Sequence, residues 1–311
     1  MPGPVAAGGA HRGGRIFFCG SATWDTIYRV ERMPAGPGKV LPTAMVEIAH
    51  GMAASAAATA ARLGGSASLI SRIGSDAVGA RIIADLEQAG VDCRHVRTFE
   101  GVGSPLSTVI VDAEGERLVV PFYPPGLGRE TGWLPLEEIR TASAVLVDIR
   151  WPEGAAAVLD AAREADIPRV LDADVGEPSV IAALTERASH AVFSEPAALA
   201  VSGASNVPEA VRSLASRFSC FVAVTAGGEG CFWMDEAGEI CQERPPRIKA
   251  VDTLAAGDVF HGAFVLGLTE GMPVRQLIRF ANAAAALKCT VFGGRAGTPS
   301  RDQVEAALAA V

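Results

Sequence analysis

The sequence predicts a three-layer α/β/α sandwich with a mostly parallel central sheet and a small β-sheet lid. Three observations predict it. Short, uninterrupted apolar segments alternate with longer helical patterns along the chain, as in parallel sheets that are buried on both faces. Polar residues directly follow several of the apolar segments. Two further stretches contain strand-like residues that break this alternation.

The apolar segments and the helical patterns follow one another in a regular order. The expected strands are residues 16–20, 67–72, 144–148, 169–172, 191–194 and 221–225. The expected helices are residues 52–63, 78–89, 152–164, 208–217, 258–269 and 274–289. This alternation implies parallel strands joined by crossover helices. Ligands of such sheets bind outside the carboxyl ends of the strands, so the polar residues found there are the candidates for a site.

The two stretches that break this alternation are residues 26–50 and 104–124. The second contains Asp112-Ala113-Glu114-Gly115 between two strand-like runs, which is typical of a β-hairpin turn. We expect both stretches to form a small sheet above the main one. Such a sheet could close over a ligand or pair with a second copy of the chain, so a homodimer through this lid is expected.

Composition limits the classes of partner. The net charge is −8 and the basic residues are not clustered, so nucleic acid is not an expected partner. No stretch reaches the ~18 consecutive apolar residues of a membrane-spanning helix. Residues 1–14 are rich in Gly, Ala and Pro without a signal-peptide run, so we expect a disordered tail before one domain at 15–311. Scattered cysteines without a Cys-x-x-Cys pair indicate reduced thiols in the cytoplasm.

The segment 251–264 carries the clearest chemical signal. Small residues, Ala255, Ala256 and Gly257, lead directly into an apolar helix that begins near Asp258. The first amides of a helix lack partners within the helix and the dipole is positive there, so this position suits a phosphate group. An aspartate beside those amides could stay ionised and accept a proton from a hydroxyl. From this segment alone, a helix cap and a general base are equally good interpretations of Asp258.

The run Asp252-Thr253-Leu254-Ala255-Ala256-Gly257-Asp258 resembles the Asp-Thr-x-Gly-Ala-Gly-Asp motif of the ribokinase, or phosphofructokinase-B, family of carbohydrate kinases. The resemblance covers most of the chain. It implies a ribokinase-like fold and transfer of phosphate from ATP, with Mg²⁺, to a hydroxyl on a small sugar. It makes Asp258 the base and the amides of Ala255, Ala256 and Gly257 an anion hole. It also implies that Asp252 binds a monovalent cation such as K⁺.

Further motifs extend the resemblance in the order that the family shows. Asp25 follows the first strand, as the family's ligand for sugar hydroxyls does, and Gly51 and Ser55 match the helix start that faces the sugar. The nucleotide side is matched by residues 225–230, by Asn282 and by residues 293–297. The resemblance therefore implies that ATP contacts Thr225, Gly227, Gly230, Asn282 and Gly294.

Three departures from the family pattern bear on these expectations. Ala255 replaces the first glycine of the anion-hole loop, which is comfortable only where φ is negative. His50-Gly51 replaces a Gly-Gly pair and Ser55 replaces an asparagine, which weakens the case for ordinary ribose or fructose recognition. The Asn-x-x-Glu motif associated with magnesium becomes Ser194-Glu195-Pro196-Ala197, in which Glu195 is the expected ligand.

Several segments, among them 147–151 and 191–196, resemble one branch of the family, the sulfofructose kinases. That branch phosphorylates 6-deoxy-6-sulfofructose and holds the sulfonate with a lysine from the lid and an arginine after the middle strand. Lys39 and Arg150 occupy the matching places, so the resemblance implies an anionic sugar or another ketose. The residues alone leave alternatives open: Lys39 as a solvated loop residue, and Arg150 as the ion-pair partner of Asp148 or Asp174. The asparagine of the branch's second lid strand is missing from the matching stretch.

Two other functions remain open at this point. A non-catalytic protein that senses a sugar or nucleotide would explain Ala255 and the altered motif at Ser194, although only catalysis requires the base Asp258. A nucleoside kinase would keep the chemistry but would need an apolar pocket in place of Lys39 and Arg150. A NAD-linked enzyme is disfavoured, because no G-x-G-x-x-G follows the first strand.

Overall fold

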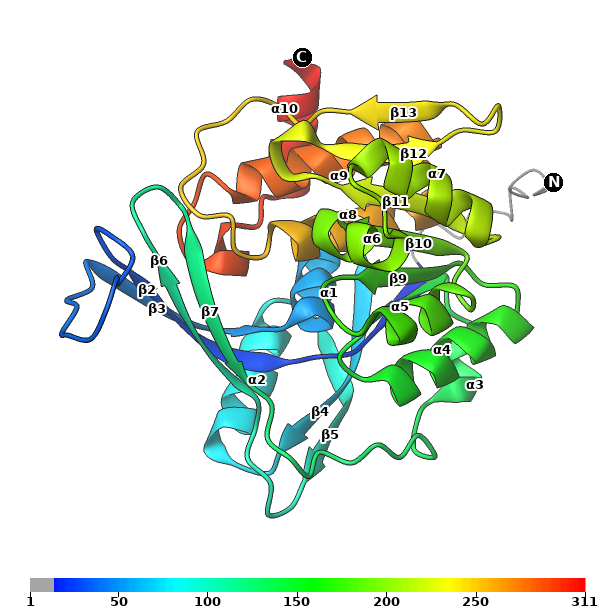
Figure 1. Ribbon diagram of the computed structural model, residues 1–311. Helices are drawn as coiled ribbons and strands as arrows, with labels where there is room; N and C mark the ends of the chain where they lie inside the picture. Colours follow the sequence, from blue (N-terminus) through cyan, green and yellow to red (C-terminus); the bar gives the residue numbers. More distant parts are fainter. Residues whose placement is uncertain (1–13, 311) are drawn as a thin grey trace.

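The computed structural model describes residues 14–310, which form three layers and a separate small sheet at one side (Figure 1). The expected α/β architecture with a small second sheet is confirmed. The expectation for the tail at 1–14 concerns residues that, except for Gly14, lie outside the described ones.

The central sheet has nine strands in the order β13-β12-β11-β10-β9-β8-β1-β4-β5. Its pairs are parallel except those of the last two strands in the chain, which pair antiparallel at one edge. The strands are β1 (Arg15–Cys19), β4 (Ser66–Gly74), β5 (Asp92–Phe99), β8 (Ala144–Asp148), β9 (Arg169–Ala173), β10 (His190–Ser194), β11 (Phe221–Thr225), β12 (Cys231–Met234) and β13 (Ile240–Glu243). All of the strands predicted for this sheet are present, because their apolar residues are buried on both faces.

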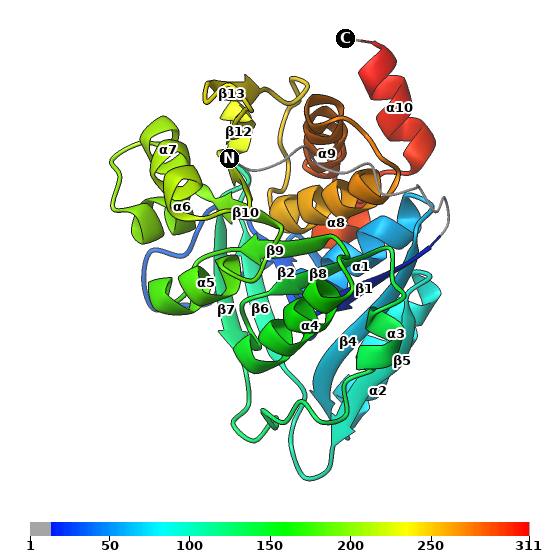
Figure 2. The same ribbon diagram turned by 90° about the vertical axis from the view of Figure 1, so that its right-hand side faces the viewer.

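Helices cover both faces of this sheet (Figure 2). One face packs against α1 (Met52–Arg62), α2 (Ala77–Gln88), α8 (Ala256–Thr269) and α9 (Val274–Lys288), with α10 (Arg301–Ala309) outside α9. The other face packs against α3 (Leu136–Ile139), α4 (Pro152–Glu164), α5 (Pro178–Thr185), α6 (Glu195–Ser202) and α7 (Val207–Arg217). No helix in the described chain combines the length and the apolar character that crossing a membrane requires.

The small sheet, here called the lid, has the strand order β3-β2-β6-β7. Its strands are β2 (Thr23–Arg29), β3 (Ala44–His50), β6 (Leu106–Val111) and β7 (Arg117–Phe122). The predicted hairpin turn is confirmed: the Asp112 carboxylate accepts hydrogen bonds from the amides of Glu114 (3.1 Å) and Glu116 (3.0 Å). Gly115 adopts φ +84°, which a glycine tolerates readily.

The two faces of the lid differ because side chains alternate along each strand. Asp25, Ser107 and Pro121 pair across β2, β6 and β7 and lie on the inner face, toward the main domain. The inner face also packs Val109 and Val111 against Leu254, in the loop before α8. The outer face carries Leu118, Val120 and Phe122 on β7, which are exposed. The lid is therefore attached to the loop that precedes Asp258.

Candidate active site

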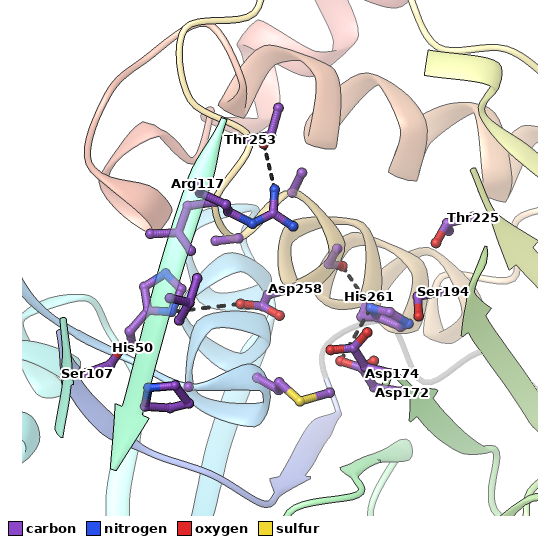
Figure 3. Close-up of a pocket in the computed structure, with 18 of the residues that line it drawn as sticks. His50, Ser107, Arg117, Asp172, Asp174, Ser194, Thr225, Thr253, Asp258 and His261 are labelled. Carbon is purple, nitrogen blue, oxygen red and sulfur yellow. Dashed lines mark hydrogen bonds and ion pairs between the residues drawn. The ribbon is translucent and has the colours of Figure 1, made fainter. Parts of the chain in front are cut away.

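A cavity of ≈ 590 Å³ lies between the inner face of the lid and the carboxyl ends of the central strands. Its wall is built from β2, β7, the loops after β8, β9, β10 and β11, and the start of α8 (Figure 3). This is the edge of the sheet at which doubly wound folds bind ligands. Asp258 lies in this wall, between the lid side chains and the residues that follow β9.

The start of α8 presents free amides to this cavity. Ala255 is the N-cap, and its carbonyl accepts the amide of Val259 at 2.9 Å. Among the described residues, the amides of Ala255 and Gly257 have no hydrogen-bond partner, whereas the Ala256 amide donates to the Thr253 carbonyl at 3.3 Å. A Cβ at Gly257 would meet open space, so the backbone there is accessible to a ligand. This arrangement suits an anion, and its role as an anion hole stays a prediction.

Ala255 does not have the negative φ that would make an alanine comfortable there. Its φ is +64° and its ψ is 8°, in the left-handed region. An L-residue with a Cβ is strained in this region by roughly 1–2 kcal/mol. The loop thus keeps the backbone shape that a glycine would adopt easily.

Asp258 is a carboxylate without a strong counter-charge. Its side chain is only 15% exposed, and the one ion-pair partner within the described chain is His50, whose Nδ1 lies 4.0 Å away. Burial raises the pKa of Asp258 well above 3.8, and the carboxylates of Asp174, Asp148 and Asp25 raise it further. Burial also lowers the pKa of His50, so this ring is neutral at neutral pH. A carboxylate with a raised pKa is a strong proton acceptor when it is ionised.

Asp25 and Gly51, which precedes α1, line the cavity, and the sugar-binding role that the sequence predicts for them stays a prediction. Asp25 lies in β2 and accepts a hydrogen bond from Thr23 Oγ1 at 2.7 Å, and His50 Nδ1 lies 3.5 Å from its carboxylate. Gly51 lines the cavity with φ +102°, and a Cβ there would lie 2.6 Å from the Ser21 carbonyl oxygen. Ser55 is buried beneath the cavity wall, and its hydroxyl has no hydrogen-bond partner among the described residues.

Arg150 lines the cavity, whereas Lys39 does not. The Arg150 guanidinium lies 3.8 Å from Asp174, and its side chain is 34% exposed. Asp148 is fully buried and accepts the Arg150 amide (2.8 Å), the Ser21 amide (2.8 Å) and the Ser21 hydroxyl (2.9 Å), so it has a structural role. Lys39 is exposed in the loop between β2 and β3, outside the residues that line the cavity.

Thr225 and Gly227 line the cavity at its far end, as the nucleotide-binding prediction requires. Gly230, Asn282 and Gly294 lie outside the cavity lining. For Asn282 and Gly230 the structure instead shows packing against the Glu243 carbonyl. The Asn282 side chain donates to the Glu243 carbonyl at 2.7 Å, and a Cβ at Gly230 would lie 2.0 Å from the same oxygen. A role of these residues in binding ATP stays a prediction.

Glu195, which follows Ser194, lines the cavity, as does Asp174. Ser194 Oγ is buried without a hydrogen-bond partner among the described residues. The described chain contains no cluster of three or more metal-binding side chains. One or two carboxylates together with substrate phosphates are, however, the usual surroundings of Mg²⁺ in kinases, so Glu195 and Asp174 fit a nucleotide-bound Mg²⁺.

Asp252 is fully buried and lies outside the cavity. Its carboxylate accepts the amides of Leu254 (2.8 Å), Gly293 (2.9 Å) and Gly294 (2.9 Å). Lys288, the last residue of α9, places its ammonium 2.6 Å from the Asp252 carbonyl oxygen and 3.4 Å from the carboxylate. The position predicted to bind a monovalent cation is thus occupied by a side chain of the protein.

Comparison with known proteins assigns the family. The model of the pfkB family of carbohydrate kinases matches residues 14–301. The chain belongs to this family. It is 28% identical to the ribokinase of Bacillus subtilis (94% of this chain, 99% of the relative). It is 31% identical to the ATP-dependent ribose-1-phosphate kinase of Halopiger xanaduensis (94% and 98%).

Solved structures agree with this assignment. A crystal structure from Agrobacterium tumefaciens, provisionally assigned as a ribokinase, has a TM-score of 0.93 at 45% identity, covering 96% of this chain and 98% of that one. Arabidopsis thaliana ribokinase, solved with ribose and ATP, has a TM-score of 0.83 at 24% identity, covering 95% and 99%. The second likeness concerns the fold alone. The relatives named here do not include a sulfofructose kinase.

This pfkB-family chain has site residues that the sequence reasoning did not select. Arg117, on β7 of the lid, lines the cavity and donates a hydrogen bond to Thr253 Oγ1 at 2.6 Å (Figure 3). The guanidinium therefore reaches from the lid to the anion-hole loop. The signal that could have found it is strand alternation, since Arg117, Val119 and Pro121 are alternate residues of one strand and all line the cavity.

His261 and Asp172 are a second pair of cavity residues to which the sequence analysis assigned no role in the site. His261 Nδ1 lies 2.7 Å from the Gly257 carbonyl and 3.4 Å from the Asp172 carboxylate, and its Nε2 lies 3.3 Å from the Val192 carbonyl. Burial raises the pKa of Asp172 well above 3.8 and lowers the pKa of His261. The ring therefore holds the first turn of α8 against β9 and β10, a packing role consistent with its position in the sequence.

Proposed function

We propose that the chain transfers the γ-phosphoryl group of ATP to a hydroxyl of a small sugar, with Asp258 as the general base. The observation that carries this proposal is the position of Asp258. It lies within the first turn of α8, beside two free amides, in the wall of the cavity between the lid and the sheet. An anion site and a proton acceptor at one point are what phosphoryl transfer to an alcohol requires.

The geometry supports a simple sequence of events. Asp258 accepts the proton of the sugar hydroxyl while that oxygen forms a bond to the γ-phosphorus and the bond to the leaving ADP oxygen breaks. The amides of Ala255 and Gly257 stabilise the negative charge on the transferred group. Mg²⁺ bound with the nucleotide would neutralise phosphate charge. Glu195 and Asp174, which also line the cavity, would orient that complex.

We further propose an anionic sugar, either a ketose such as 6-deoxy-6-sulfofructose or a sugar phosphate. Arg150 and Arg117 both line the cavity and carry the positive charge that an anionic group would need. Within residues 14–310, the one ion-pair partner of the Arg150 guanidinium is Asp174 at 3.8 Å, so the guanidinium can turn toward a ligand. Arginine binds a tetrahedral oxyanion through two N–H groups at once. The proposed part of Lys39 requires its loop to move toward the cavity when the lid closes.

A screen for ADP release tests both parts of this proposal. The panel contains ribose, ribose 1-phosphate, fructose, 6-deoxy-6-sulfofructose, other sugar acids and a set of nucleosides, each with ATP and Mg²⁺. We expect turnover with at least one anionic sugar, at a higher kcat/KM than with its neutral analogue. Preference for a nucleoside would contradict the sugar assignment. Absence of ADP release and of any thermal stabilisation by ATP with Mg²⁺ would contradict the kinase assignment itself.

We also propose that two copies of the chain pair through their lids in the cytoplasm. Leu118 is 46% exposed, and Val120 and Phe122 are each 57% exposed, on one face of β7. Adjacent exposed apolar residues of this kind are typical of a protein interface. All six cysteines are free, which suits a reducing compartment. Sedimentation of the wild type and of Phe122→Glu tests the pairing: we expect a dimer for the first and a monomer for the second, and a wild-type monomer would refute it.

A further inference from the structure

We infer that the ammonium of Lys288 takes the place of a monovalent cation at Asp252, so that this kinase works without K⁺ or any other such ion. The inference rests on the proposed kinase function for its activity readout. The observation behind it is a contact: Lys288 Nζ lies 2.6 Å from the Asp252 carbonyl oxygen and 3.4 Å from its carboxylate.

Lys288 is buried at this position and paired with Asp252. The chain has only three lysines, Lys39, Lys249 and Lys288. The first two are exposed, whereas the side chain of Lys288 has 0% exposure, as has that of Asp252. Lysine is almost never fully buried unless it is paired. A buried ammonium on a buried carboxylate leaves the pair neutral, and a further cation there would meet a positive charge in a medium that screens it poorly.

The pair has a clear task in the site. The Asp252 carboxylate accepts the Leu254 amide at the base of the anion-hole loop, and the Gly293 and Gly294 amides of the loop after α9. The Cys289 carbonyl, one residue beyond α9, accepts the amides of Val251 and Asp252 at 2.8 and 3.2 Å. These bonds fasten the end of α9 to the segment that shapes the anion hole. A dissolved ion would stabilise this contact between α9 and the anion-hole segment only while the ion is bound. Lys288, in contrast, is covalently part of α9.

Lys288 is thus a positioning residue, because it acts on the anion hole through Asp252 and lies away from the cavity. Without its charge, the Asp252 carboxylate would be buried with amide partners alone, and the segment at 252–257 would relax. A shift of about 1 Å at a reacting centre can cost about a hundredfold in rate. The cavity left by a shorter side chain would expose oxygen atoms that suit an added monovalent cation.

The first test needs no variant. Turnover of the wild type is compared in chloride salts of K⁺, Na⁺, NH₄⁺ and tetramethylammonium at equal ionic strength. We expect the rates to agree within about twofold, since ordinary salt screening is the same in all four buffers. Activation by K⁺ or NH₄⁺ of about tenfold or more over tetramethylammonium would overturn the inference.

The second test adds Lys288→Ala, with Lys249→Ala as the matched control at an exposed lysine. In tetramethylammonium, Lys288→Ala should lose turnover by about a hundredfold, and K⁺ or NH₄⁺ should restore much of it, because either ion can occupy the vacated position. Lys249→Ala should behave as the wild type. A Lys288→Ala variant with full turnover in tetramethylammonium would overturn the inference.

Melting temperature gives a readout that does not depend on the proposed activity. K⁺, compared with tetramethylammonium, should raise the melting temperature of Lys288→Ala and leave that of the wild type unchanged. A K⁺-dependent rise in the wild type would contradict the inference. If the wild type shows this ion-independent stability but phosphorylates no sugar, the proposed function fails and the assignment of Lys288 stands.

Discussion

Asp252 and Asp258 lie at the two ends of one short segment, yet their surroundings are opposite. Asp252 is fully buried with an ammonium and three amides on it. Burial would raise its pKa, but Lys288 and those amides outweigh burial and lower the pKa below 3.8. Among the described residues, the ion-pair partner of Asp258 is a neutral histidine at 4.0 Å, and burial and neighbouring carboxylates raise the pKa of Asp258 well above 3.8. One carboxylate is neutralised and shapes the loop, and the other is left uncompensated and available to a proton.

The difference shows how a single segment can combine stability with reactivity. A compensated carboxylate stabilises the folded state, whereas an uncompensated one destabilises it and is retained where chemistry needs it. Neither carboxylate can take over the task of the other, because Asp252 lies outside the cavity and Asp258 lies in its wall.

The largest effect is expected from Asp258→Asn. This change keeps the shape of the side chain but removes the proton acceptor, so turnover should fall by about 10²–10⁴-fold while the fold persists. Steady-state ADP release and the circular dichroism spectrum check the two parts. The matched control is Asp302→Asn, a carboxylate in the first turn of α10, which should leave turnover unchanged. If Asp258→Asn keeps more than about a tenth of the wild-type rate, Asp258 is not the general base.

Asp252→Asn should act on stability first. The change leaves the Lys288 ammonium buried without its counter-charge, and breaking a buried pair in this way costs about 3–5 kcal/mol. Urea denaturation measures the free energy of unfolding, and the double variant Asp252→Asn with Lys288→Met should recover part of the loss. A loss below about 1 kcal/mol would mean that the Asp252–Lys288 pair does not stabilise the folded protein.

Arg150→Ala extends the comparison from the carboxylates to their cations. Lys288 is fixed on Asp252, whereas Arg150 is partly exposed and only 3.8 Å from Asp174. If Arg150 binds the anionic group of the substrate, its loss should lower kcat/KM for an anionic sugar by ~2–4 kcal/mol and barely affect a neutral ketose. Equal losses on both sugars would show that Arg150 is structural, as the partner of Asp174.

Ala255→Gly gives the smallest effect and concerns the backbone between the two carboxylates. Glycine adopts the observed φ of +64° without strain, but it also gains freedom in the unfolded chain, so the net stabilisation should be about 0.5–1 kcal/mol. Thermal unfolding measures it, with Ala256→Gly as the control, since Ala256 has no positive φ. If both glycines destabilise the protein equally, the strain at Ala255 is absent.

The central layers could be predicted from sequence because local and tertiary preferences agree there. The strand at 144–148 and the helix at 152–164 occur with the predicted bounds, since the first is wholly buried and the second is strongly amphipathic. The edge strands β5 and β13 were missed because their residues are partly exposed and their apolar runs are broken by polar residues, and β12 was missed because its apolar run is only four residues long. Their identity as strands depends on the neighbour with which each pairs.

The site was predictable where a motif fixes the backbone and not where the fold brings side chains together. Asp258 and its loop are contiguous in sequence, so one pattern indicates their chemistry. Arg117 reaches Thr253 across 136 positions of the chain, and this contact follows from the register of β6 with β7. Lys288 ends a helix, where a lysine is ordinarily an exposed partner of the helix dipole, and only the packed structure shows that it is buried.

The pH dependence of the free energy of unfolding, compared between the wild type and Asp258→Asn, tests most directly whether Asp258 is an uncompensated carboxylate. A group whose pKa is raised on folding stabilises the protein below its unfolded pKa, and this contribution is lost as pH rises through the folded pKa. The account predicts that the two proteins are similar in stability near pH 3.8, and that Asp258→Asn becomes the more stable as pH rises, by about 1 kcal/mol or more at neutral pH. A wild type that is the more stable at neutral pH would contradict the account, because Asp258 would then be a compensated group like Asp252.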